Sequence, residues 1–291
     1  MAHYVGEKFL PTSRHDTYPA IDPSKADLTG KVVVITGASR GIGQTTAIAV
    51  AQAGAKGIAL LARGNLGATK SECLQVAREG HKPEVLALSV DVMDTAQVNA
   101  AAKRIVETFA RVDIVINNAG YLEQYALVAD SEPAEWWKSF EINLRGTYAV
   151  TRALLPLLIA SAGDKTIVNV ASAGALGFLP RFSAYTIAKL AQLRLAEWVS
   201  GEYGDKGVLA YSVHPGVIGT EMSTRLPPEF QAPDFLTDTT QLAAHTLLWL
   251  VRERREWLAG RFVDARWDVE ALLAKKQEVI EGDKLKINLV V

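Results

Sequence analysis

The chain has 291 residues, with 31 basic and 32 acidic side chains, a formal net charge of −1 and 49% hydrophobic residues. This balance excludes intrinsic disorder, which combines low hydrophobicity with a high net charge, and the strongly basic field of a nucleic-acid-binding domain. No apolar run reaches the roughly 18 residues of a membrane span. The single cysteine, Cys73, cannot form an internal disulfide, so we expect a cytoplasmic protein in a reducing compartment.

The segment 1–29 differs in composition from the rest of the chain. It is polar and contains Pro11, Pro19 and Pro23, which predicts an extended N-terminal arm. Residues 30–291 are predicted to form one domain, because no linker or internal repeat divides them.

Short apolar segments alternate with helix-like segments along this domain. Strands are expected at Val32–Thr36, Gly57–Ala62, Glu84–Val90, Val112–Gly120, Thr166–Ser172, Val208–Gly216 and Gly260–Ala265. Helices are expected at Gln44–Ala53, Gly67–Glu79, Thr95–Phe109, Ala134–Asn143, Gly146–Ile159, Ser183–Tyr203 and Thr240–Arg252, with a solvated helix or tail at Ala274–Lys286. The alternation predicts an α/β fold, a single doubly wound, Rossmann-like parallel sheet of about seven strands with helices on both faces.

A glycine-rich turn follows the first expected strand directly, with the sequence TGASRGIG from Thr36 to Gly43. Glycines permit a tight turn and a close approach of the backbone to a pyrophosphate, and the N-terminus of the next helix offers unpaired N–H groups. The spacing G-x-x-x-G-x-G departs from the usual dinucleotide fingerprint. The alternative interpretation is a purely structural loop, which the position after a first strand disfavours.

The end of the second strand predicts which nucleotide binds. An acidic residue about 20 positions after the glycines binds the ribose of NAD, whereas an arginine there suits the 2′-phosphate of NADP. Arg63 stands at this distance from Gly43, and Arg40 lies in the glycine turn itself. We therefore expect NADPH to be preferred over NADH, unless Arg63 is only a solvated surface residue.

Tyr185 and Lys189 lie one helical turn apart at the start of the longest expected helix, so they share one helix face. A tyrosine has an ordinary pKa of about 10. A neighbouring ammonium group should lower the pKa of Tyr185 toward about 7 and make it a proton donor and acceptor near neutral pH. Taken alone, such a pair is common on ordinary helix surfaces.

Several motifs together resemble the main branch of the short-chain dehydrogenase/reductase family, and in overall texture its fungal members. They are TGASRGIG, NNAG at Asn117–Gly120, Asn143, Ser172 at the family's usual spacing before Tyr185, Tyr185-x-x-x-Lys189 and Pro215-Gly216, in the family's order. The resemblance covers about residues 29–265. Many members have two serines where this chain has Ala171-Ser172, but only the second has the catalytic spacing.

The resemblance implies a catalytic set of Asn143, Ser172, Tyr185 and Lys189. Tyr185 would be the general acid for carbonyl reduction, and Ser172 would orient the substrate oxygen. Lys189 would bind the nicotinamide ribose and lower the pKa of Tyr185. Asn143 would bend its helix and help to hold a water that relays protons.

The resemblance also implies a cofactor site. Asp91 resembles the residue that contacts the adenine, Asn117 and Gly120 would line the cofactor cleft, and the segment from Pro215 to Thr220 would hold the nicotinamide. The predicted cofactor-binding residues are Gly37, Ser39, Arg40, Gly41, Ile42, Gly43, Arg63, Asp91, Val92, Asn117, Ala119, Gly120, Tyr185, Lys189, Pro215, Gly216, Ile218 and Thr220. The scattered histidines predict no metal site.

The substrate is less well defined by the sequence. Residues 219–240 form a long, proline-broken segment that predicts a substrate lid. Tyr121, Phe178, Phe182 and Met222 are candidate substrate contacts, and apolar walls would favour a lipophilic ketone or secondary alcohol. The alternative for the phenylalanines is core packing. The family implies a homodimer or homotetramer, built on the helices at residues 146–159 and 183–203.

The sequence thus predicts a reversible, NADPH-dependent oxidoreductase that reduces the ketone or aldehyde carbonyl of a lipophilic small molecule to a secondary alcohol. Three alternatives stay open. One is an NAD(P)-dependent alcohol dehydrogenase that works in the oxidative direction, and another is a tailoring enzyme of secondary metabolism derived from the same family. The third is a non-catalytic NADP-binding regulatory protein, which the complete catalytic set disfavours. No nucleic-acid or membrane partner is expected.

Overall fold

A seven-stranded parallel sheet forms the centre of the molecule in a computed structural model that describes residues 9–289. The strands are β1 (Val32–Thr36), β2 (Gly57–Ala62), β3 (Glu84–Ser89), β4 (Ile114–Asn117), β5 (Thr166–Val170), β6 (Leu209–His214) and β7 (Phe262–Asp264). Their order is β3-β2-β1-β4-β5-β6-β7, so the strand order reverses between β1 and β4. The predicted fold class is confirmed, and this reversal is where open α/β sheets bind ligands.

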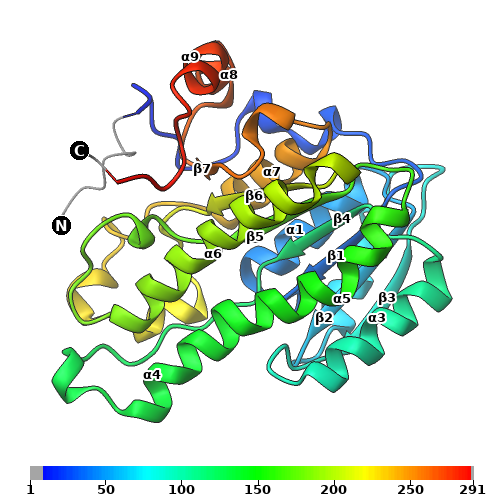
Figure 1. The fold of residues 1–291 in the computed structure, drawn as a ribbon. Coiled ribbons are helices and arrows are strands. Elements are labelled where there is room, and N and C mark those ends of the chain that lie inside the picture. Colours follow the sequence, from blue (N-terminus) through cyan, green and yellow to red (C-terminus); the bar gives the residue numbers. More distant parts are fainter. Residues whose placement is uncertain (1–8, 290–291) are drawn as a thin grey trace.

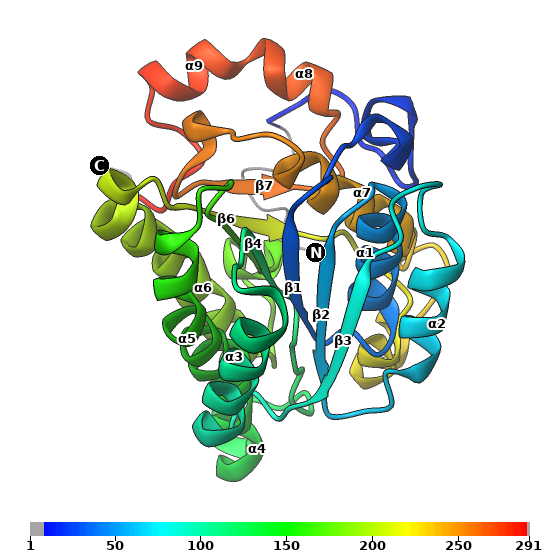
Figure 2. The ribbon, with the colours of Figure 1, turned by 90° about the vertical axis from the view of Figure 1, so that its right-hand side faces the viewer.

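Helices cover both faces of the sheet (Figures 1 and 2). On one face lie α1 (Gly41–Gln52), α2 (Gly67–Gln75) and α7 (Thr240–Val251). On the other lie α3 (Thr95–Phe109), α5 (Thr147–Ala160) and α6 (Ser183–Tyr203), with α4 (Pro133–Phe140) continuing away from α5. The short helices α8 (Val269–Ala274) and α9 (Lys276–Glu281) follow β7. Within residues 9–289, no helix has both the length and the apolar character that crossing a bilayer requires.

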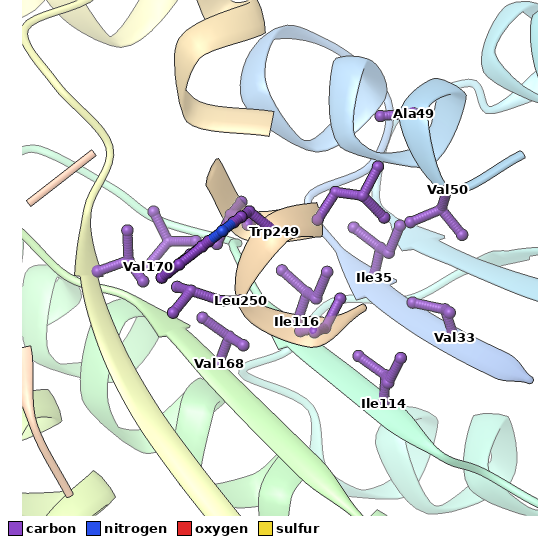
Figure 3. Packing of buried hydrophobic residues seen from close by; sticks show 14 of the residues in the cluster. Val33, Ile35, Ala49, Val50, Ile114, Ile116, Val168, Val170, Trp249 and Leu250 are labelled. Atoms are coloured by element: carbon purple, nitrogen blue, oxygen red, sulfur yellow. The ribbon is translucent and has the colours of Figure 1, made fainter. Parts of the chain in front are cut away.

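The alternation of side chains along the strands divides the core into two layers. In β1, Val33 and Ile35 belong to the layer beneath α1 and α7, whereas Val32 and Val34 belong to the layer beneath α3 and α5. Figure 3 shows the first layer, in which Trp249 of α7 packs over strand side chains. Because both faces are covered, β1 is apolar from residue 32 to residue 35, as expected for a parallel sheet.

Two predicted helices, Ala134–Asn143 and Gly146–Ile159, are parts of one continuous helical stretch. A π-helical segment, Glu141–Gly146, joins α4 to α5 without a break. The predicted tail is also more ordered than expected, since α9 buries Val279 completely. Both differences come from long-range packing, which local composition does not encode.

The described part of the N-terminal segment, residues 9–29, packs on the domain. Leu10, Ile21 and Leu28 are buried in the layer beneath α1 and α7. Arg14 donates to a carboxylate oxygen of Asp268, at the start of α8, over 2.6 Å. Residues 1–8 of the predicted arm lie outside the described residues.

We predict that Trp249→Ala lowers the free energy of unfolding by about 3–5 kcal/mol, because it removes a large side chain from a closely packed layer. The Trp249 side chain is only 1% exposed. Denaturant-induced unfolding measures the change. Trp137→Ala is the matched control, because that residue is 59% exposed on α4. Equal losses in the two variants would contradict the packing shown here.

Candidate active site

The predicted site residues gather at one edge of the sheet. The glycine turn follows β1, the Asn117–Gly120 segment ends β4, Ser172 follows β5, and Pro215-Gly216 follows β6. Because all strands run in parallel, their carboxyl ends share this edge. Residues that are far apart in the sequence therefore surround one region of the surface.

The glycine turn has a geometry that only glycine permits. Gly37 and Gly41 adopt positive φ angles of 66° and 56°. A Cβ atom at Gly43 would lie 2.3 Å from the carbonyl oxygen of Gly37, whereas a Cβ at Gly41 would meet nothing among the described residues closer than Thr220, at 3.6 Å. The N-cap residue Arg40 makes no side-chain cap, so the first N–H groups of α1 stay available. Open backbone donors beside an uncrowded glycine fit the phosphates of a dinucleotide.

Two asparagines at the end of β4 have different roles. Asn118, which we had not singled out, donates to the carbonyl oxygens of Thr36 and Gly37 over 2.9 and 3.2 Å and so holds the glycine turn against β4. Asn117 is only 2% exposed and donates to Thr151 and Asn169. The expectation that Asn117 lines the cofactor cleft is corrected, because its side chain points into the core between α5 and β5.

The hydroxyl groups of Ser172 and Tyr185 meet at the end of β5. Ser172 Oγ accepts a hydrogen bond from the N–H of Gly174 over 3.1 Å, which fixes its direction. The Ser172 side chain lies near the Tyr185 hydroxyl, and its hydrogen-bonding effect by itself lowers the pKa of Tyr185. Burial has the larger effect and raises the pKa of Tyr185 to about 12. At neutral pH this phenol is therefore protonated.

Lys189 lies behind the Tyr185 ring, on the same face of α6. Its Nζ donates to the carbonyl oxygen of Val170 over 2.7 Å and lies 5.6 Å from the centre of the ring. Burial lowers the pKa of Lys189 to about 7. The expectation that Lys189 brings the pKa of Tyr185 to near 7 is wrong for the protein alone, because the amine faces a strand carbonyl and the ring face, and burial weakens its own charge.

Glu123 is a functional candidate that the sequence analysis missed. Its Oε1 accepts from the backbone N–H of Tyr185 over 3.0 Å, in the first turn of α6. The residue is 4% exposed, and its Oε2 is buried without a hydrogen-bond partner among the described residues. The charge of Glu123 contributes to the raised pKa of Tyr185. No local motif identifies this role, because the two partners lie far apart in the sequence.

Asn143 lies in the π-helical segment and is completely buried. Its side chain pairs with the backbone of Tyr121 in both directions, over 2.7 and 3.0 Å. Its carbonyl oxygen accepts from Gln192 Nε2 over 2.5 Å. Gln192, which follows Lys189 in α6, was also missed by the sequence analysis, and within residues 9–289 its buried Oε1 has no partner.

Both predicted phosphate-binding arginines are exposed and already have acidic neighbours. Arg63 lies 3.8 Å from Asp91, the predicted adenine contact. Arg40 lies 2.8 Å from Glu221, which belongs to the predicted lid. The side chains of Arg63 and Arg40 are 61% and 68% exposed, so both are free to turn toward an anion. Val92 is buried and packs against Gly146, which gives it a structural role.

The predicted lid, residues 219–240, follows closely on the Pro215-Gly216 turn after β6. Its 3-10 turns are Glu221–Arg225 and Pro228–Phe230. Met222 Cε lies 3.4 Å from the position of a Cβ atom at Gly120. Arg225 donates to the hydroxyl of Tyr121 over 2.9 Å, and that hydroxyl donates to Glu135. The lid segment thus contacts both the β4 and the α4 sides of the site.

The candidate substrate residues are only partly brought together. Tyr121 and Met222 lie beside the site, as just described. Phe178 is 79% exposed on the loop after Ser172. Phe182 is completely buried at the start of α6, where its ring lies 6.3 Å from that of Tyr125. The expectation that Phe182 contacts substrate is therefore corrected in favour of core packing.

Comparisons with known proteins agree with this geometry. A family model described as short chain dehydrogenase matches residues 31–230. The short chain dehydrogenase citE of Monascus ruber is 46% identical over 288 residues, which cover 98% of each chain. Levodione reductase has a similar crystal structure, with a TM-score of 0.74, 28% identity, and coverage of 81% of this chain and 96% of that chain.

A putative short chain dehydrogenase from Shigella flexneri, complexed with NADP, also has a TM-score of 0.74 and 28% identity, covering 84% of this chain and 100% of that chain. The chain belongs to the short chain dehydrogenase/reductase family and is of the fungal type. It is an oxidoreductase that acts on CH–OH or C=O groups with a nicotinamide dinucleotide. The family resemblance inferred from the motifs is confirmed.

We predict that Glu123→Gln lowers the pKa of Tyr185, because the substitution removes a negative charge that raises this pKa. Alcohol oxidation requires the base form of Tyr185. In a plot of kcat for oxidation against pH, the rise in kcat should therefore occur at lower pH. Glu132→Gln, at the exposed start of α4, serves as the control. A rise that stays in place or moves to higher pH would exclude this effect of the Glu123 charge.

Proposed function

We propose that the protein is an NADPH-dependent carbonyl reductase, which reduces the ketone or aldehyde carbonyl of a lipophilic small molecule to an alcohol in a reversible reaction. One observation carries this proposal: the Ser172 side chain lies close enough to the Tyr185 hydroxyl at the end of β5 to lower the pKa of that phenol, and the Lys189 amine is buried behind the phenol ring. Two convergent hydroxyl donors suit a carbonyl oxygen on which negative charge develops.

The proton state of Tyr185 supports the reductive direction. With a pKa of about 12, the phenol carries its proton at neutral pH and is ready to act as a general acid. The same group is a poor base at that pH. Oxidation of an alcohol therefore needs either a higher pH or a change in the surroundings of Tyr185.

The chemical step then follows from the positions of these groups. When bound, NADPH supplies the hydride that the carbonyl carbon receives. Ser172 donates a hydrogen bond to the substrate oxygen and keeps it beside Tyr185. The Tyr185 O–H bond breaks as its proton passes to that oxygen, which completes the alcohol and leaves a tyrosinate. Lys189, buried beside the ring, stabilises this negative charge when its amine is protonated.

The preference for NADPH is supported by Arg40 and Arg63. Both are exposed at the carboxyl ends of β1 and β2, and guanidinium groups bind phosphate through paired, charge-assisted hydrogen bonds. No acidic residue stands at the position that would favour the ribose of NAD. Glu221 and Asp91 keep the two arginines near the site until an anion replaces these carboxylates as their partner.

The preference for a lipophilic substrate is supported by the lid segment, residues 219–240. Phe230 and Phe235 pack together within it at 5.1 Å, and Met222 lies near Gly120. A tailoring enzyme of secondary metabolism would use the same residues and remains the alternative for the biological role. We further propose that the protein is cytoplasmic. We also propose that it forms a homodimer or homotetramer, because α5 and α6 leave Tyr148, Ile187 and Trp198 exposed.

We predict that Tyr185→Phe lowers kcat for ketone reduction by about 10²–10⁴-fold, because the general acid is lost. The affinity for NADPH should change little. Loss of NADPH absorbance over a panel of lipophilic ketones measures turnover, and NADPH fluorescence measures binding. Undiminished turnover in this variant would refute the mechanism. Binding without turnover in the wild type would favour the regulatory alternative.

We predict that Arg63→Ala weakens NADPH binding by about 10- to 100-fold, the range expected when hydrogen bonds to a charged group are lost. The affinity for NADH should stay within a factor of about two, because NADH lacks the 2′-phosphate. Fluorescence titration of both nucleotides measures the two constants. Arg104→Ala, an exposed arginine on α3, is the matched control. Equal losses for NADPH and NADH would rule out phosphate recognition by Arg63.

A further inference from the structure

The N-terminal segment 13–18 runs along the end of the predicted lid, although the two lie near opposite ends of the sequence. The carbonyl oxygen of His15 accepts from the N–H of Thr239 over 3.0 Å. Asp16 accepts from the hydroxyl of Thr239 over 2.6 Å. Figure 2 shows the dark-blue start of the described chain beside α7 and α8. The segment is thus fixed at the point where the lid joins α7.

Asp238 is the residue that this segment reaches. Its side chain is fully buried. Oδ1 accepts from Nδ1 of His15 over 2.5 Å, and Oδ2 accepts from the backbone N–H of Val217 over 2.5 Å. The N–H of Asp238 donates in turn to the carbonyl oxygen of Val217 over 3.1 Å. Asp238 therefore binds Val217 through both its side chain and its backbone.

Helix capping does not account for this carboxylate. Thr239 is the N-cap of α7, and its hydroxyl accepts from Leu242 over 3.1 Å. The carboxylate of Asp238 points instead toward the segment after β6. A Cβ atom at Gly216, where φ is 105°, would lie 2.7 Å from Oδ2 of Asp238. The close contact leaves no room for a side chain at residue 216.

We propose that residues 13–18 support the cofactor site from outside, and that His15 and Asp238 are positioning residues that hold Val217 in place for the nicotinamide dinucleotide. The inference rests on the proposed function, because a bound nicotinamide dinucleotide is expected, from the family resemblance, to contact the segment from Pro215 to Thr220. His15 supplies the shorter of the two hydrogen bonds that Oδ1 of this buried carboxylate accepts from side chains. Without His15, Oδ1 keeps the longer hydrogen bond from Thr237, at 3.3 Å, and the carboxylate holds Val217 less firmly.

Two readouts test the proposal in His15→Ala. The dissociation constant for NADPH, from fluorescence titration, should rise about tenfold, as expected for the loss of a hydrogen bond to a buried carboxylate. Amide hydrogen exchange at Val217 should quicken by about the same factor. At saturating NADPH, kcat should change less than about threefold, because the chemical groups of the site are untouched.

Matched variants separate positioning from general stability. His15→Asn restores a donor toward Asp238 and should recover most of the affinity. Asp238→Ala should reproduce the effects of His15→Ala. His81→Ala, a histidine whose ring pairs with the nearby carbonyl oxygen of Glu79, should leave both readouts unchanged.

Each outcome decides the question. Wild-type values of both readouts in His15→Ala and Asp238→Ala would overturn the proposal, as would a lower melting temperature with unchanged affinity for NADPH. If the wild type itself failed to bind NADPH, the proposed function would be refuted. The rate of amide hydrogen exchange at Val217 would then still show whether His15 and Asp238 hold this segment in place.

Discussion

The site depends on a network of buried hydrogen bonds that fixes α6 against the central strands. Lys189 donates to the carbonyl oxygen of Val170 in β5. Asn169, in the same strand, donates to the carbonyl oxygen of Gln192 over 3.3 Å, and the Gln192 side chain continues to Asn143. Because these side chains are buried, each lost bond would carry the full cost of an unsatisfied polar group. The helix is held at the register that places Tyr185 beside Ser172.

Burial has the largest effect on the pKa values of the two groups at this site. It raises the pKa of Tyr185 to about 12 and lowers that of Lys189 to about 7. The Glu123 carboxylate acts in the same direction as burial on Tyr185. The chain therefore keeps a proton on the phenol near neutral pH, whereas Lys189 is then close to its own pKa and carries its charge part of the time.

The sequence predicted the fold well because periodicity and strand length depend on residues that are close in the chain. It placed Ser172 and Tyr185 on the correct elements for the same reason, since residues at strand ends share one edge of a parallel sheet. It could not predict side-chain directions that tertiary packing decides. Asn117 turns into the core and Phe182 is covered, although both stand in segments that border the site.

Contacts between segments that are far apart in the sequence could not be predicted from local sequence patterns either. In the sequence, Glu123 looks like any other carboxylate in a loop. Its role becomes visible only in the fold, where it accepts a hydrogen bond from the first turn of α6. His15 and Asp238 come from opposite ends of the chain, and neither belongs to a motif. In the protein alone, the pKa of Tyr185 differs from the prediction because helical spacing gives the distance between two side chains but not their exposure to solvent.

The π-helical segment between α4 and α5 makes the length of this helical stretch critical. Each residue of an α-helix turns the chain by about 100° and advances it by about 1.5 Å. A π-helical turn accommodates one residue more than an α-helical turn of the same stretch. Deleting a single residue from 141–146 would therefore convert the π-helical turn into an α-helical one and leave α4 and α5 near their present orientations. The change would fall on the turn itself, where the buried side chain of Asn143 pairs with the backbone of Tyr121. Substitutions are tolerated along much of an exposed helix, but here the loss of one residue would remove the wide turn that places Asn143 at the site.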